Sequence, residues 1–318
     1  MMKRIGLCIT LIIASTSLLA LPAYAQLTQN EIQKLLASDK ATGDWFGGSV
    51  AIDGDTALVG AFFEDDSGTQ SNGAAYVFTR TAGIWAQQDK LLASDKANDD
   101  LFGVSVAIDG DTAVIGAIGA DVGGAAYVFN RSEGIWTQQA KLLASDKARG
   151  DSFGTSVVID GDTAVIGATG EGDSGTEYNG AAYVFTRTAG IWAQQDKLLA
   201  SDTAIGDHFG VSVAIDGDTA VIGAIGEDDS GMIRNGAAYV FSRSVGTWTQ
   251  QAKLLASDKA DFDQFGVSVA IDGDTAMIGA DRESDRGTRY NGAVYVFTRF
   301  GRYLDATGQT AGERQGHR

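Results

Sequence analysis

The chain has 318 residues, 44% of them hydrophobic, and a net charge of −17 at neutral pH, which disfavours nucleic acid and anionic lipid as partners. Its only cysteine, Cys8, and its only proline, Pro22, lie near the N-terminus, so a chain starting at Gln26 would have no disulfide and no proline-stiffened linker. A partner that is neutral, cationic or bridged by a metal ion fits this composition better.

The first 25 residues have the pattern of a secretory signal peptide. Two basic residues precede an apolar run from Ile5 to Leu21, and the A-Y-A triplet at 23–25 supplies a cleavage site with small residues. The run is at the short end for spanning a bilayer. We therefore expect residues 1–25 to be removed and the mature protein to be secreted, periplasmic or on the cell surface.

One sequence block, F-G-x-S-V-A-I-D-G-D-T-A-x-x-G-A, occurs five times at intervals of 51 or 56 residues. Repetition at such a period indicates modules that bury their apolar faces against copies of themselves. Within a repeat region from 26 to 303, we place the copies at about 34–89, 90–140, 141–196, 197–252 and 253–303. The Phe-Gly landmarks of the block are Phe46-Gly47, Phe102-Gly103, Phe153-Gly154, Phe209-Gly210 and Phe265-Gly266.

Each copy divides into four strand-sized runs separated by glycine and acidic turns. In the first copy, the runs 48–52, 56–61 and 73–78 carry small or apolar residues on both sides, which predicts inner strands without a wet face. The fourth run, 84–94, has the composition of a helix, but it follows the third run after a tight turn and is polar. We therefore expect it to be an outer edge strand.

Four antiparallel strands per repeat predict an all-β fold, a β-propeller with five four-stranded blades. The N-terminal stretch 32–38 matches an outer strand with no inner strands before it, whereas the fifth repeat lacks a recognisable outer strand after Phe297. Pairing of the two ends would close a ring, and we expect this arrangement. A truncated chain and an open fragment that completes itself by association are the alternatives. Residues 304–318 match nothing upstream and are expected to be disordered.

The Phe-Gly landmarks, with G-A-A-Y-V-F-T-R at 73–80 and W-x-Q-Q-x-K-L at 85–91, resemble FG-GAP repeats. The resemblance covers residues 34–299 and is strongest to the bacterial secreted subgroup, whose repeats read S-V-A-I-D-G-D-T-A. It implies a propeller like that of the integrin α-subunit, with roles in adhesion and recognition. The family propeller usually has seven blades, whereas this chain has five repeats.

The resemblance also implies calcium, because integrin-like blades often carry a D-x-D-x-D-G loop around the ion. The equivalent segment here, Asp53-Gly54-Asp55, offers two carboxylates, whereas calcium takes about six to eight oxygens. An Asp-Gly pair between strands is instead a hairpin signal, with glycine free to adopt positive φ. The remaining metal candidates lie in longer acidic loops and are Glu64, Asp65, Asp66, Glu227, Asp228 and Asp229.

Two acidic loops recur in the repeats. The S-D-K-A-x-x-D-x-F-G loop, with Asp39 and Asp44 in the first copy, is typical of turn and capping hydrogen bonds. The E-D-D-S-G-T-Q-S-N loop varies between copies while the strands around it stay fixed, which is where a binding function would first be sought. A solvated acidic loop is the simpler interpretation of this second loop.

Residues suited to catalysis are scarce. The two histidines, His208 and His317, have no counterparts in other repeats, and recurring serines such as Ser49 lie in strands without a matching base. A carboxylate pair for glycoside cleavage would be expected to break the repeat symmetry of the inner strands, and no copy does so. We predict no enzyme, no catalytic residues and no cofactor, with calcium as the one ion to be tested.

These observations together predict an exported, non-catalytic binding or adhesion module. Its partner would be a protein or glycan at the cell surface, with no nucleic acid and no membrane span after signal cleavage. The first alternative is a calcium-dependent carbohydrate-binding propeller. The second is a propeller glycosidase or lyase.

Overall fold

The computed structural model describes residues 31–172, 178–284, 290–300 and 303–305. It divides the chain into two units, 1–34 and 35–318. The expected signal peptide lies outside the described residues, as does the expected disordered tail apart from residues 304 and 305, which belong to a strand. In the described part of the chain, no helix is long and apolar enough to cross a membrane.

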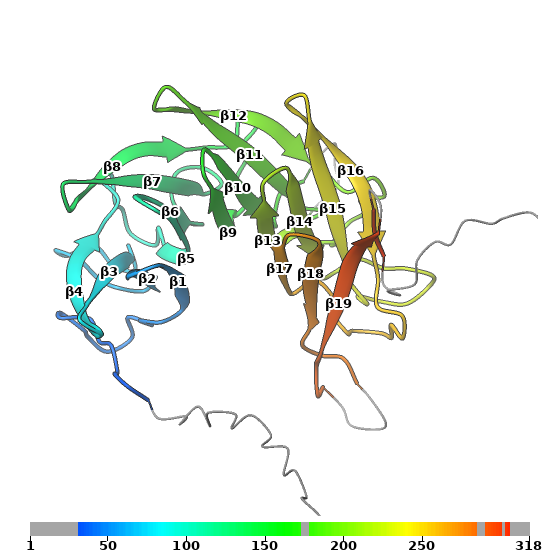
Figure 1. Ribbon diagram of the computed structural model, residues 1–318, viewed down its shortest axis with the longest axis horizontal. Coiled ribbons are helices and arrows are strands. Elements are labelled where there is room, and N and C mark those ends of the chain that lie inside the picture. Colours follow the sequence, from blue (N-terminus) through cyan, green and yellow to red (C-terminus); the bar gives the residue numbers. More distant parts are fainter. Residues whose placement is uncertain (1–30, 173–177, 285–289, 301–302, 306–318) are drawn as a thin grey trace, which may run out of the picture. The chain divides into compact units, whose positions relative to one another are not determined.

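The second unit is all-β and consists of five antiparallel sheets of four strands, which follow one another in chain order (Figure 1). This confirms the predicted fold class of four-stranded blades. The strands, sheet by sheet, are β1 (Ser49–Asp53), β2 (Thr56–Ala61), β3 (Ala74–Thr81) and β4 (Ile84–Leu91); β5 (Phe102–Asp109), β6 (Thr112–Ala117), β7 (Ala125–Ser132) and β8 (Ile135–Leu142); β9 (Phe153–Asp160), β10 (Thr163–Ala168), β11 (Ala181–Thr188) and β12 (Ile191–Leu198); β13 (Phe209–Asp216), β14 (Thr219–Ala224), β15 (Ala237–Ser244) and β16 (Thr247–Leu254); and β17 (Ser268–Asp272), β18 (Thr275–Ala280), β19 (Ala293–Phe300) and β20 (Tyr303–Asp305).

Local turn chemistry sets the register of each sheet. Asp53 pairs with Thr56, which leaves Gly54-Asp55 as a two-residue turn with Gly54 at φ +54°, as a type II′ turn requires. The hairpin between β3 and β4 turns at Ala82-Gly83, where both residues have positive φ, as in a type I′ turn. The polar fourth run is therefore a strand despite its helical composition.

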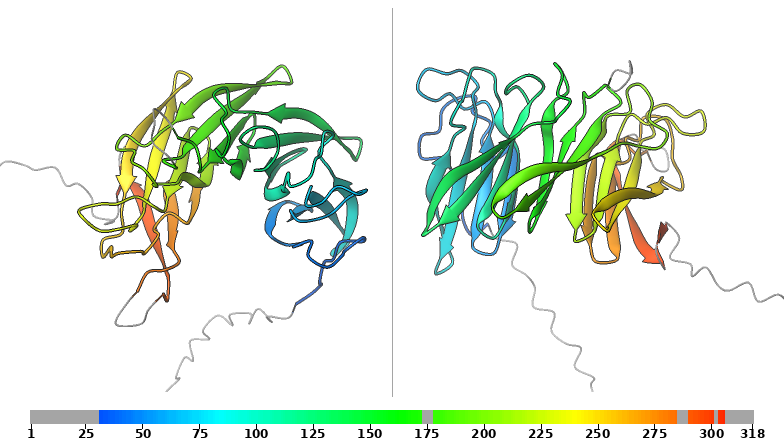
Figure 2. Two further views of the ribbon diagram at one scale, coloured as in Figure 1. Left: turned by 180° about the vertical axis from the view of Figure 1, so that it is seen from behind. Right: turned by 90° about the horizontal axis from the view of Figure 1, so that it is seen from above.

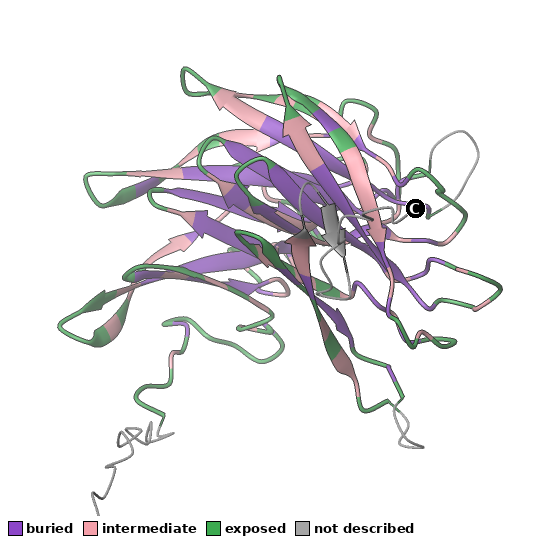
Figure 3. Cartoon of the chain, turned by 45° about the vertical axis from the view of Figure 1, so that its right-hand side comes forward, coloured by how far each residue is buried: buried purple, intermediate pink, exposed green. Residues whose placement is uncertain are grey.

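The hydrophobic core lies between consecutive sheets. Leu58 and Val77 of the first sheet pack in one cluster with Phe102 and Ile108 of the second, and three further clusters repeat this arrangement down the chain. Figure 3 shows the buried residues in the middle of the sheets and the exposed residues at the hairpins. A sheet therefore depends on its neighbours to bury its two faces.

The first strands of the five sheets come together around one shared pocket. Serines and valines from β1, β5, β9, β13 and β17 line it. Figure 1 shows these strands on the inner side and β4, β8, β12 and β16 on the outer side, and the left-hand view of Figure 2 shows the same arrangement from behind. The arrangement is that of propeller blades around an axis.

The two end sheets differ from the prediction. The expectation that the inner strands lack a wet face is wrong for β1, where Val50 and Ile52 are exposed, and for β18 and β19, where Met277 and Val296 are exposed. No further sheet of the described chain covers these two faces. The fifth sheet has a short outer strand, β20, which pairs with β19 from Thr298 to Phe300. The outer strand expected at 32–38 is wrong, because residues 31–38 are in no strand and β20 takes the outer position beside β19. Closure of a ring stays a prediction.

The inter-sheet core predicts unequal roles for equivalent phenylalanines. Phe102 is fully buried, whereas Phe46 keeps the same edge-to-face contacts within its own sheet but is partly exposed. We expect Phe102→Ala to lower the free energy of unfolding by about 3–5 kcal/mol in urea titrations, and Phe46→Ala to cost clearly less. Equal losses would assign the stabilisation to ring contacts within each sheet.

Candidate functional site

The variable loops lie on one edge of the sheets, which we call the loop edge. It combines the β2–β3 loop (62–73), the linker between the first two sheets (92–101) and their counterparts in later repeats. Loop and linker are joined by backbone hydrogen bonds, such as Asp99 N to Gln70 O at 2.9 Å. In the described residues, loop and linker therefore form one surface at the ends of the strands.

A partly buried ion cluster, with Glu64 buried and Asp39 exposed, supports the loop edge in the first sheet. Lys90 Nζ donates to Asp39 at 2.7 Å and to Glu64 at 2.6 Å, and the Tyr76 hydroxyl donates to the same Asp39 at 2.8 Å. The ammonium also lies 5.7 Å from the centroid of the Tyr76 ring. The counterparts in the next three sheets are Lys141 with Asp95, Lys197 with Asp146 and Glu171, and Lys253 with Asp202 and Glu227.

The pKa values of Asp39 and Glu64 shift in opposite directions. Burial by itself would raise the pKa of Asp39, but hydrogen bonds from Lys90 and Tyr76 outweigh it and lower that pKa. For Glu64, burial outweighs the contact with Lys90 and raises the pKa. Its second oxygen, Oε2, is buried and has no hydrogen-bond partner among the described residues. Asp39 is thus held as a carboxylate, while Glu64 is the more easily protonated of the two.

The predicted metal candidates already have partners within the protein. Glu64 contacts Lys90, and Asp66 pairs with Lys96 from the neighbouring linker. Asp65 accepts a hydrogen bond from Ser71 N at 2.6 Å. The second set repeats these roles, with Glu227 on Lys253, Asp229 on Lys259 and Asp228 accepting from Arg234 N.

This donor set does not fit a calcium shell, because the ammonium groups stand where the cation would have to be. Within the described ranges, no group of three or more His, Cys, Asp or Glu side chains is placed to hold a metal ion. Calcium dependence therefore stays a prediction to be tested in solution.

The Asp-Gly turns lie on the opposite edge and use both carboxylates. Asp53 accepts a hydrogen bond from Gly110 N of the next sheet at 2.8 Å, and Asp55 pairs with Arg80 at 2.6 Å. The recurring serine also has a structural role, since Ser49 Oγ donates to Gly103 O at 2.7 Å. These contacts agree with the turn role predicted for the Asp-Gly pairs.

An aromatic group on the loop edge was missed by the sequence reasoning. The Trp45 ring lies 5.5 Å from the Phe62 ring and 5.2 Å from the Phe63 ring, in edge-to-face geometry. The Trp45 side chain is nevertheless 63% exposed. We call Trp45, Phe62 and Phe63 the aromatic platform.

The aromatic platform can be recognised in the sequence by a departure from the repeat. The Phe62-Phe63 pair replaces the non-aromatic pairs Ile118-Gly119, Thr169-Gly170, Ile225-Gly226 and Asp281-Arg282 of the other repeats. Other aromatic residues at variable positions of the loop edge are also exposed, and these are Tyr178, Phe262 and Tyr290.

A protein-family model described as FG-GAP repeat matches the chain five times, at residues 30–78, 85–129, 136–185, 192–241 and 248–297. Together these matches cover more than half of the chain. Each of the last four begins in the outer strand of one sheet and ends in the third strand of the next. The repeat that this family model describes thus includes one contact between two sheets. A comparison with curated proteins found no match.

The capping aspartates of the loop edge predict a pH dependence. Asp207 accepts a hydrogen bond from Ala204 N at 2.6 Å, as predicted for this loop. Burial raises the pKa of Asp207 to about 6 despite that bond, and nearby Glu227 adds to the rise. Between about pH 4 and pH 6 the folded state therefore holds this proton more tightly than the unfolded state, and stability falls as the pH rises through that window.

We expect Asp207→Asn to remove this penalty. Its melting temperature relative to the unchanged protein should rise from pH 4 to pH 6 and then level off. Asp202→Asn is the control with the opposite sign in a lower pH range. Burial would raise the pKa of Asp202, but Lys253 and Tyr239 outweigh it and lower that pKa. The melting temperature of this variant relative to the unchanged protein should therefore fall as the pH rises toward about 4 and stay level from pH 4 to pH 6. A difference for Asp207→Asn that does not vary with pH in thermal melts would contradict this assignment.

Proposed function

Because the chain belongs to the FG-GAP repeat family, we propose that it is an exported, non-catalytic binding or adhesion module whose ligand binds at the loop edge. The family and the blade-like sheets support the class of module. A rigid sheet scaffold that carries variable loops is an arrangement that many binding proteins use. The finer parts of the proposal rest on particular side chains.

The aromatic platform is the observation that carries the proposal. Phe62 and Phe63 hold Trp45 from the side, which leaves much of its ring to solvent. Large aromatic side chains with few rotatable bonds dominate many binding sites, because they offer contact area at little cost in conformational entropy. The platform would therefore anchor the apolar face of a ligand.

Charge narrows the class of ligand. The chain has 41 acidic and 24 basic residues, and Asp65 and Asp99 are exposed on the loop edge of the first repeat. Anionic polymers would be repelled, whereas a neutral glycan or a protein with basic residues would not. We propose a glycan or protein of the cell surface as the ligand.

Export is proposed from the leader pattern of residues 1–25. It places the module where cell-surface ligands occur. Cell fractionation followed by mass spectrometry of the protein tests export. A chain that begins at Gln26 outside the cytoplasm supports it, and an uncleaved chain in the cytoplasm contradicts it.

Binding to glycan arrays and to extracts of surface proteins tests the ligand class. We expect Trp45→Ala to weaken the binding of any ligand found there by about tenfold or more. Ile84→Ala is the matched control, since Ile84 is exposed on the opposite edge at the start of β4. Equal effects of the two variants would move the site away from the platform. Turnover of a bound glycan would favour the glycosidase or lyase alternative.

Calcium addition separates the proposal from calcium-dependent carbohydrate binding. We expect the melting temperature and the ligand affinity to be the same in calcium and in EDTA, because Lys90 and Lys253 occupy the acidic clusters. A site that binds calcium in the folded state would raise the melting temperature as calcium is added. Such a rise would establish the alternative.

A further inference from the structure

Consecutive sheets meet at a junction that is built the same way four times. At the first junction, Phe102 N donates to Asn72 O at 3.0 Å, and Ser49 Oγ donates to Gly103 O at 2.7 Å. A Cβ atom at Gly60 would lie 2.0 Å from Gly103 O, so the first sheet must have glycine there. The Phe-Gly turn of one sheet thus inserts into a receiving groove on the sheet before it.

The other three junctions share these contacts. Phe153, Phe209 and Phe265 are fully buried, as Phe102 is. Their sheets also form a parallel bridge between the phenylalanine and a glycine of the preceding sheet. The serine bonds at these junctions are Ser105 to Gly154, Ser156 to Gly210 and Ser212 to Gly266.

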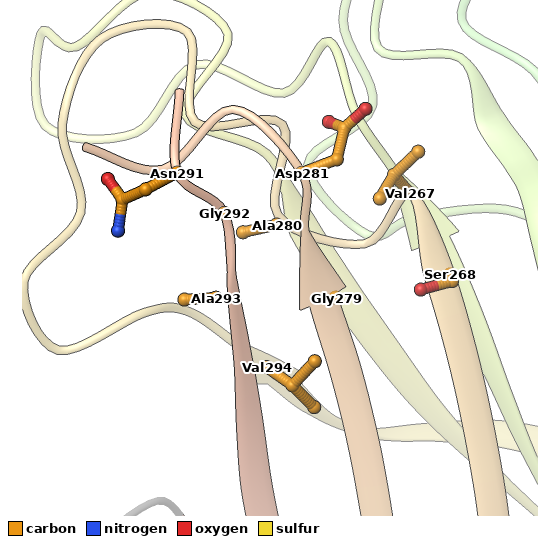
Figure 4. A pocket seen from close by; sticks show the side chains of 9 residues that line it. All are labelled: Val267, Ser268, Gly279, Ala280, Asp281, Asn291, Gly292, Ala293 and Val294. Carbon is orange, nitrogen blue, oxygen red and sulfur yellow. The ribbon is translucent and has the colours of Figure 1, made fainter. Parts of the chain in front are cut away.

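The fifth sheet has the same receiving groove, and no Phe-Gly turn of the described chain fills it. A Cβ atom at Gly279 would meet only atoms of its own sheet, unlike one at Gly60. Figure 4 shows the vacant groove, with Ser268 on one strand and Val294 on another. We call this groove the socket, and its lining residues include Ser268, Gly279, Ala280, Gly292, Ala293 and Val294.

Apolar side chains beside the socket are exposed. Val296 is 55% exposed, whereas its counterpart Val77 in the first sheet is fully buried by the second sheet. Met277 is likewise exposed, although its counterpart Leu58 is fully buried. Val294 replaces an alanine of the other repeats and adds further apolar surface. This surface is the kind that consecutive sheets cover elsewhere in the chain.

The first sheet carries the complementary part. No atom lies within 4 Å of a Cβ built on Gly47, and Phe46 is partly exposed. Ile52 is 65% exposed, although Ile108, its counterpart in the second sheet, is buried. We call the Phe46-Gly47 turn with Ile52 the plug. It is the one Phe-Gly turn of the five that enters no groove in the described structure.

Polar groups at the two ends also match. At the fourth junction, Gly273 N donates to Asp216 at 2.6 Å, and Arg299 donates to Thr219 Oγ1 at 2.6 Å. The fifth sheet offers the corresponding acceptors and the first sheet the corresponding donors. These counterparts are Asp272 and Thr275 on the fifth sheet, and Gly54 and Arg80 on the first.

We infer that the socket on the fifth sheet binds the plug of a second copy of this chain, so that copies associate head to tail. The contact would repeat the junction already present between consecutive sheets, with the same serine, glycine and phenylalanine residues. Such an interface is heterologous, because each copy uses a different surface.

A second copy is favoured over the chain's own first sheet by the packing of the interior. The four internal junctions are filled in the same structure that leaves the plug and the socket exposed. Bringing the two ends of one chain together would change the angle between sheets at junctions whose side chains are closely packed. Binding of a second copy leaves the angles between the sheets of each chain unchanged.

Paired surface variants test the inference by sedimentation velocity on the exported chain. We expect the unchanged protein to gain mass with concentration, and Ile52→Lys and Val296→Glu each to remain monomeric. An equimolar mixture of the two variants should form a dimer and nothing larger, since one intact plug and one intact socket remain. Val245→Lys, on an exposed hairpin, is the control that keeps association.

The contradicting outcomes are distinct. An unchanged protein that is monomeric at every concentration, or a mixture of variants that stays monomeric, would overturn the inference. Dimers of Ile52→Lys alone would point to a symmetric contact through the fifth sheet instead. A short thiol crosslinker supplies the second measurement, with Cys8→Ser, Ile52→Cys and Val296→Cys in one chain. Links between chains support the inference, and links only within one chain would establish ring closure in its place.

Discussion

The close approach of backbone to backbone at the junction between sheets is the constraint on which the rest depends. The carbonyl of Gly103 lies where any side chain at Gly60 would have to be, and Phe102 fills the space beside it. Both landmarks of the repeat, Phe-Gly and Gly-Ala, are the two halves of this contact. Their recurrence therefore reflects packing between sheets and carries no information about a ligand.

The junctions leave the loop edge as the surface where repeats can differ. Strands and turns are fixed by neighbours on both sides, whereas the β2–β3 loops change without disturbing the core. The aromatic platform is the clearest such change, because Phe62 and Phe63 have no aromatic equivalents in other repeats. A binding function of this chain would thus depend on residues that differ from one repeat to the next.

The acidic composition has a largely structural explanation on this edge. Lys90 brings together Asp39 and Glu64, and Tyr76 completes the group from the same sheet. Such clusters attach each linker to the sheet that follows. Their lysines pair with carboxylates that the sequence alone would suggest as metal ligands. A count of acidic residues in a loop therefore overstates its capacity for metal, because their charge partners, such as Lys90 of β4 and Lys96 of the next linker, lie further along the chain.

The sequence by itself determined the strands of the first four sheets, the inner strands of the fifth and the turns, because the Asp-Gly turns and the apolar runs act over a few residues and recur five times. It did not predict β20, and it placed a strand at 32–38 where the structure has none. The fivefold recurrence of the Phe-Gly landmark also indicated a repeated packing contact, whereas the structure alone decided that Phe102, Phe153, Phe209 and Phe265 are fully buried and that Phe46 is partly exposed. The tertiary structure alone decided the partners of Glu64 and Asp66, the grouping of Trp45 with Phe62 and Phe63, and the exposure of Ile52 and Val296. These features depend on contacts between residues far apart in the chain and on the neighbours of each sheet. Local sequence patterns encode neither.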